Sequence, residues 1–149
     1  MKKAREVVTY KDYFEEFFEK QSQKVRDKII KVLDIIEQIE RVPVTYLKYI
    51  EGTNGLFEIR VQLGSDIFRI FCFFDGNKMV ILLCGFQKKT QKTPPGEIKK
   101  AEKIMSEYYD EKRKETKKMK TKTLDQIKTK YYGEIGTPER DRIERDLDA

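Results

Sequence analysis

Two arginines and a lysine-rich loop are the residues of this chain best suited to bind an anion. Arg60 lies in the alternating stretch LFEIRVQL, and Arg69 interrupts the apolar run IFRIFCFF. The loop QKKTQKT then carries Lys88, Lys89 and Lys92. A guanidinium group can bind a phosphate through two parallel hydrogen bonds, and clustered lysines attract polyanions. The set therefore indicates a site for a polyanion or a phosphate group.

Arg69 permits two interpretations. A buried, unpaired guanidinium is costly, so Arg69 could form an ion pair with Glu58 on the neighbouring predicted strand. It could instead be displayed from that strand, next to Arg60, to contact a ligand. Both interpretations are compatible with the sequence pattern.

The composition excludes several other chemistries. The 149 residues include no His, so a Ser-His-Asp triad, a His acid–base pair and a His-ligated metal site cannot form. No metal or other cofactor is expected. Cys72 and Cys84 lie in apolar runs, which favours buried, reduced thiols and a reducing cytoplasm. No apolar run approaches the roughly 20 residues of a membrane helix, so we expect no membrane contact.

Charge divides the chain into two parts. The whole net charge of +6 lies in residues 1–118, because acidic and basic residues balance in 119–149. This change in composition predicts one domain over 1–118 and a separate tail over 119–149.

Hydrophobic periodicity predicts an α+β fold that would position these residues. Apolar stripes indicate two N-terminal helices and a later helix that begins near Pro94-Pro95. Between them, alternating and apolar runs predict a meander of three strands with tight turns. The third of these strands is almost wholly apolar, so we expect it to be central. The predicted elements are a strand over 5–10, helices over 11–20 and 22–40, and strands over 56–63, 66–74 and 78–86.

The middle of the chain resembles the HigB branch of the RelE/ParE toxin superfamily, and phage-type HigB-like toxins in particular. The shared elements are GLFEIRV, RIFCF and GFQKKTQKTP followed by a helix rich in Lys and Glu. The resemblance covers about residues 4–115. It implies a RelE-like α+β fold, with two N-terminal helices packed on a small antiparallel sheet and a C-terminal helix.

The resemblance also implies a function. HigB-like toxins are mRNA interferases that enter the ribosomal A site and cut mRNA during translation. They are neutralised by a DNA-binding HigA antitoxin, and they need no small-molecule cofactor. The expected partners are therefore a HigA-type antitoxin, the ribosome and mRNA.

The tail resembles the beginning of HigA antitoxins of the same group. Leu124, Ile127 and Tyr131 share one helical face, and Thr137 can cap a second helix. Neither helix is long enough to fold alone, so we expect both to dock on the first domain. The alternative is a toxin with an unrelated C-terminal extension.

RNA cleavage by the neighbouring 2′-hydroxyl needs a base, stabilisation of a charged phosphorus centre and an acid for the leaving oxygen. The identity of the acid stays open, because some relatives place His or a C-terminal Tyr at the site. The expected catalytic residues are Arg60 and Arg69 as the phosphate clamp, Lys88 and Lys89 as stabilisers or acid, and Glu58 as base or as partner of Arg60. Lys48 and Lys92 are expected to contact the RNA backbone, and Tyr46 to stack on a base.

Two other functions compete with cleavage. ParE toxins share the superfamily but bind DNA gyrase and cut nothing, and a basic patch can also meet an acidic protein surface. Alternatively, the chain is a self-neutralised fusion in which the tail lies across the basic groove. The tail acids that would pair with the groove are Asp125, Glu134, Glu139, Asp141, Glu144, Asp146 and Asp148.

Overall fold

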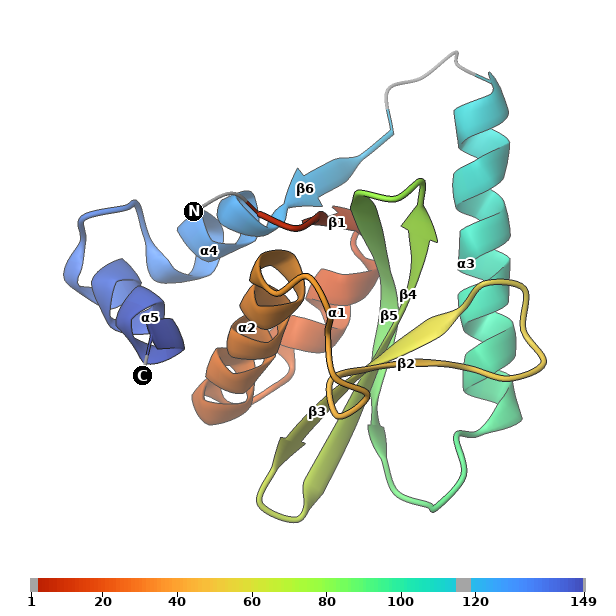
Figure 1. The fold of residues 1–149 in the computed structure, drawn as a ribbon, viewed down its shortest axis with the longest axis horizontal. Coiled ribbons are helices and arrows are strands. Elements are labelled where there is room, and N and C mark those ends of the chain that lie inside the picture. Colours follow the sequence, from red (N-terminus) through yellow and green to blue (C-terminus); the bar gives the residue numbers. More distant parts are fainter. Residues whose placement is uncertain (1–2, 115–118, 149) are drawn as a thin grey trace.

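The computed structural model describes residues 3–114 and 119–148, with side chains to residue 145. Within these ranges the chain forms an α+β fold with a six-stranded sheet and five helices (Figure 1). The elements are β1 (Glu6–Tyr10), α1 (Tyr13–Glu19), α2 (Gln23–Gln38), β2 (Leu47–Tyr49), β3 (Phe57–Leu63), β4 (Asp66–Asp75), β5 (Met79–Lys88), α3 (Pro95–Lys114), β6 (Thr121–Thr123), α4 (Leu124–Tyr132) and α5 (Pro138–Asp148).

The sheet is mixed, with strand order β2-β3-β4-β5-β1-β6. The predicted meander is confirmed as β3, β4 and β5, which pair antiparallel. The expectation of a small antiparallel sheet was wrong, because β1 pairs with β5 in parallel. The short strands β2 and β6 extend the two edges of the sheet. β5 is central, as its apolar sequence indicated.

The two faces of the sheet are covered by different helices (Figure 1). Helices α1 and α2 pack on one face, where Ile59 of β3 and Ile70 of β4 join their apolar stripes. Helix α3 covers part of the other face through Ala101, Ile104 and Tyr108. Because side chains alternate between faces along a strand, each strand contributes to both cores.

Local signals set the ends of the helices. The hydroxyl of Ser22 accepts a hydrogen bond from the Val25 amide at 3.3 Å and caps α2. Helix α2 ends at Gln38, earlier than the predicted end near residue 40. Pro95 is the first residue of α3, a position where its missing N–H costs nothing.

Helix α3 is the longest of the described helices, at 20 residues, and it carries charged side chains along its exposed side. In the parts of the chain that the structure describes, no helix is both long and apolar enough to cross a membrane.

Residues 119–148 join the rest of the fold. Strand β6 pairs with β1 at the edge of the sheet, and α4 and α5 lie beside α2 on the left of Figure 1. Leu124, Ile127 and Ile143 are buried in the same core as α1 and α2. The predicted boundary after residue 118 falls outside the described residues.

Candidate nucleic-acid interface

The strand register brings four of the predicted site residues onto one face of the sheet. Arg60 on β3 lies directly opposite Arg69 on β4, and Glu58 is two residues before Arg60. Lys88, at the end of β5, pairs with Ile67 on β4, and Ile67 is two residues before Arg69. All four share the face that α3 covers elsewhere. The side chains of Arg60, Arg69, Lys88 and Glu58 therefore lie together on the part of this sheet face that α3 does not cover.

Arg69 is paired with Glu58, which confirms the first of its two interpretations. Its Nε atom lies 2.6 Å from Oε2 of Glu58, and the side chains are 7% and 10% exposed. The Nε–H bond is not aligned with the carboxylate, so the contact is an ion pair without a well-formed hydrogen bond. Glu58 is also 3.6 Å from Nε of Arg60. One carboxylate thus holds both guanidinium groups.

Arg60 and Arg69 also line a cavity of about 360 Å³ at the edge of β3. Among the described residues this edge is open beyond Arg60, because β2 pairs with residues 57–59 of β3 and the Arg60 amide donates to the Tyr46 carbonyl. The lining is mostly polar and bears no acidic side chain, so the cavity favours an anion. The lining residues are Lys28, Thr45, Tyr46, Arg60, Val61, Gln62 and Arg69.

Electrostatics couple Lys88 to this cluster. Burial lowers the pKa of Lys88, and the positive charge of Arg69 lowers it further. Arg60 and Lys48 act in the same direction, while Glu58 opposes them. Burial also lowers the pKa of Arg69, although an arginine stays charged at any physiological pH. Lys88 is therefore the cation of the cluster that can most readily release a proton.

The other predicted residues lie at different distances from the cavity. Tyr46 lines it, and its carbonyl accepts a hydrogen bond from the Arg60 amide at 2.8 Å. Lys48 is exposed on β2, opposite Glu58. Lys89 and Lys92 are exposed after β5, and no contact among the described residues directs their side chains to the cavity.

Sequence reasoning missed Lys28, Thr45 and Gln62. Lys28 comes from α2, and no spacing in the sequence links this helix to β3. The contact depends on how α2 crosses the sheet, which the pattern does not encode. Gln62 alone could have been found, because it alternates with Glu58 and Arg60.

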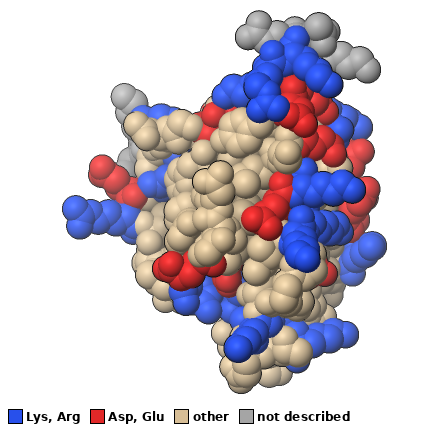
Figure 2. Space-filling view, turned by 90° about the vertical axis from the view of Figure 1, so that its right-hand side faces the viewer, with Lys and Arg blue, Asp and Glu red and all other residues tan. Residues whose placement is uncertain are grey.

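Other features of the molecule lie outside this cluster. Figure 2 shows the α3 side, where both basic and acidic side chains lie around an uncharged central area. A cavity of about 460 Å³ there contains none of the predicted site residues. Cys72 and Cys84 are free and buried, and burial raises the pKa of the Cys84 thiol to about 11. Among the residues described, no group of three Cys, Asp or Glu could hold a metal ion.

The tail binds an acidic surface formed by α1 and α2. Glu15 is 2% exposed. Its carboxylate accepts hydrogen bonds from the ammonium groups of Lys122 and Lys130 at 2.5 Å each and from the hydroxyl of Tyr131 at 2.7 Å. Burial alone would raise the pKa of Glu15, but these three donors lower it to about 2. Among the described residues, further ion pairs between the two parts are Lys120–Asp12, Arg142–Asp27 and Lys128–Asp34.

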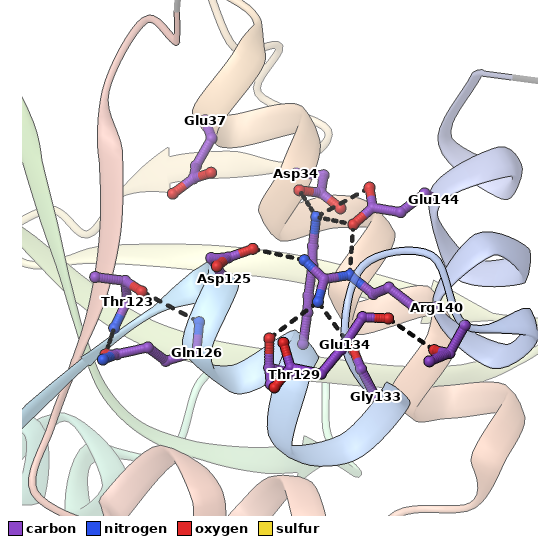
Figure 3. Close-up of polar contacts among 12 residues, drawn as sticks. Asp34, Glu37, Thr123, Asp125, Gln126, Thr129, Gly133, Glu134, Arg140 and Glu144 are labelled. Carbon is purple, nitrogen blue, oxygen red and sulfur yellow. Dashed lines mark hydrogen bonds and ion pairs between the residues drawn. The ribbon is translucent and has the colours of Figure 1, made fainter.

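Acidic side chains of the tail mostly pair within the tail. Figure 3 shows Arg140, which is 2% exposed, between Asp125 at 2.6 Å and Glu144 at 2.8 Å. It also donates to the Thr129 hydroxyl and the Gly133 carbonyl, so it joins α4 to α5. In the alternative of a self-neutralised fusion, the tail acids lie across the basic groove, but Asp125 and Glu144 pair with Arg140 instead. No described tail residue lines the cavity at Arg60 and Arg69, and the side chains of Asp146 and Asp148 lie outside the described residues.

Comparison with known proteins assigns the chain to a family. Residues 16–106 match the family model described as phage derived protein Gp49-like (DUF891). The match covers more than half of the chain, so the protein belongs to this family, which is associated with RelE/HigB-like toxins. No curated protein matches the chain.

Proposed function

We propose that this protein is a HigB-type toxin of a type II toxin–antitoxin system, and that it cleaves mRNA on the translating ribosome. The observation that carries the proposal is the convergence of Arg60, Arg69 and Lys88 around Glu58, beside a polar cavity. Membership of the Gp49-like family supports a toxin. Because the substrate is mRNA on a ribosome, the proposal also implies a cytoplasmic protein.

The chemistry follows from the charges at the site. The 2′-hydroxyl gives its proton to water as its oxygen attacks phosphorus, and the bond to the 5′-oxygen breaks. Negative charge then accumulates on the phosphate oxygens. Arg60 and Arg69 can neutralise this charge, and fixed cations in a partly buried site do so better than water. Lys88, with its lowered pKa, can protonate the leaving oxygen. Glu58 is engaged by two arginines, so we assign it to positioning them rather than to accepting the proton.

We further propose that residues 119–149 correspond to the beginning of a HigA-type antitoxin and that residues 1–118 are the toxin domain. Five tail cations pair with Asp12, Glu15, Asp27 and Asp34 of the first part, which supports a matched pair of surfaces. A separate HigA-type antitoxin would use this same surface. Because no described residue of the tail lines the arginine cavity, the full chain is expected to be active.

Primer extension on an mRNA from a cell-free translation reaction tests the proposal. The full chain should produce cuts only when ribosomes are present. Arg60→Gln should abolish them, whereas Arg41→Gln, which removes an exposed positive charge outside the cavity, should not. Normal translation with no cuts in the mRNA would refute the proposed ribonuclease activity. A supercoiling assay with DNA gyrase would then test the non-catalytic ParE-like alternative.

A further inference from the structure

Lys28 extends the basic site beyond the meander. It lies on α2, which covers the opposite face of the sheet from α3, yet it lines the same cavity as Arg60 and Arg69. The side chain is half-buried, and among the described residues it forms no ion pair or hydrogen bond. Its neighbour Asp27 pairs with Arg142 instead. An unpaired ammonium group at a cavity that also holds two arginines is available to bind an anion.

Arg69 supplies a second group that can bind a ligand. Its side chain is 7% exposed, and its Nε atom is held by Glu58 at 2.6 Å. Nη1 donates to the Phe68 carbonyl at 3.0 Å, and among the described residues Nη2 has no acceptor. A ligand oxygen in the cavity could satisfy this guanidinium more fully.

The walls of the cavity select the kind of anion. Thr45 and Gln62 add neutral hydrogen-bonding groups, and Tyr46 adds an aromatic ring. Phosphate oxygens suit the cations and the polar groups, while a base or sugar can lie against the ring. A volume of about 360 Å³ accommodates one nucleotide.

We propose that Lys28 binds a phosphodiester of a single-stranded RNA next to the linkage that Arg60 and Arg69 hold for the reaction. The strand would cross the free edge of β3, from the loop after β5 to the N-terminal half of α2. This inference rests on the proposed function and assigns Lys28 as a substrate-binding residue.

The test is binding of a fluorescent, uncleavable 2′-O-methyl RNA to the full chain, measured by anisotropy over a range of salt concentrations. Lys28→Gln should weaken binding about tenfold at low salt, as expected for one charged hydrogen bond. It should also reduce the slope of log K against log salt by about 0.7, the value for one phosphate contact on a single strand. Lys28→Arg, which keeps the charge, should restore both.

Lys24→Gln is the matched control, because it removes an exposed positive charge from the same helix outside the cavity. It should change neither affinity nor slope. Equal losses in Lys24→Gln and Lys28→Gln would reflect general attraction and would overturn the inference. Unchanged binding in Lys28→Gln, or no binding by the wild-type chain, would overturn it as well. Cleavage is measured separately, so RNA binding through Lys28 without any ribosome-dependent cut would reject only the proposed enzyme.

Discussion

Nε of Arg69 lies 2.6 Å from Oε2 of Glu58, and both side chains are at least nine-tenths buried. Removing one partner of such a pair leaves the other charge buried and alone, which usually costs about 3–5 kcal/mol. Arg69 is therefore part of the folded framework as well as of the proposed site. Different substitutions of Arg69 can separate its role in the folded framework from its role in the proposed site.

Arg69→Ala should destabilise the protein by about 3 kcal/mol and abolish cleavage. Arg69→Lys keeps a positive charge near Glu58 but loses the planar fork that binds a phosphate. It should therefore retain most of the free energy of unfolding while still abolishing cleavage. Urea denaturation and primer extension on the same samples measure the two effects. Wild-type cleavage by Arg69→Lys would show that the guanidinium geometry is not needed.

Lys88 should determine the alkaline side of the pH–rate profile. A general acid works only when protonated, so cleavage should decline as pH rises through its pKa, which is lower than that of an ordinary lysine. Lys88→Arg cannot lose its proton, so its cleavage should be slow and independent of pH in this range. Lys89→Arg, a change at the exposed neighbour, is the control and should keep the wild-type profile. A wild-type pH–rate profile in Lys88→Arg would show that a group other than Lys88 is the general acid.

Glu15 should make the docking of the tail sensitive to acid. Its pKa is lowered to about 2 in the folded chain, below the ordinary value of 4.5, so its contribution is complete above pH 4.5. As pH falls from 4.5 towards 2, this contribution, about 3 kcal/mol, is lost. Glu15→Gln should remove most of this contribution to the free energy of unfolding at pH 7. The stability of this variant should then depend less on pH between 4.5 and 2. Glu16→Gln, at an exposed position, should behave like the wild type in denaturation at each pH.

Gly85 is needed for close packing between β5 and α1. A Cβ atom at this position would lie 2.6 Å from Cδ2 of Phe17. Gly85→Ala should therefore lower the free energy of unfolding by about 1–3 kcal/mol, as other overpacked cores do. Gly96→Ala is the contrasting change, because its Cβ meets nothing within 4 Å and lies in the first turn of α3. It should be neutral or slightly stabilising in thermal denaturation.

Much of the fold was predictable because its signals are local. The alternation in β3, the apolar run of β5, the cap at Ser22 and the proline at the start of α3 each specify an element directly. The parallel pairing of β1 with β5 was not predictable, because it joins segments that are far apart in the sequence. Strands β2 and β6 have three residues each, too few for a periodic pattern.

The site was predictable where it follows strand alternation. Glu58 and Arg60 share a face, and the hairpin turn places Arg69 opposite Arg60. The place of Lys28 at the cavity and the ion pairs of the tail could not be predicted, because both depend on how the helices pack. The sequence shows which tail residues are charged. It does not show that Lys130 faces α1, or that Asp125 and Glu144 pair with Arg140.

The position of cuts relative to the reading frame tests the central claim most directly. Two mRNAs that differ by one inserted nucleotide upstream are translated with the full chain, and the cuts are mapped by primer extension. An enzyme that acts in the ribosomal A site should cut at a fixed place in each codon, so the insertion should shift the cuts with the new frame. Arg60→Gln should give none. Cuts at the same nucleotides in both frames, or cuts without ribosomes, would contradict the account.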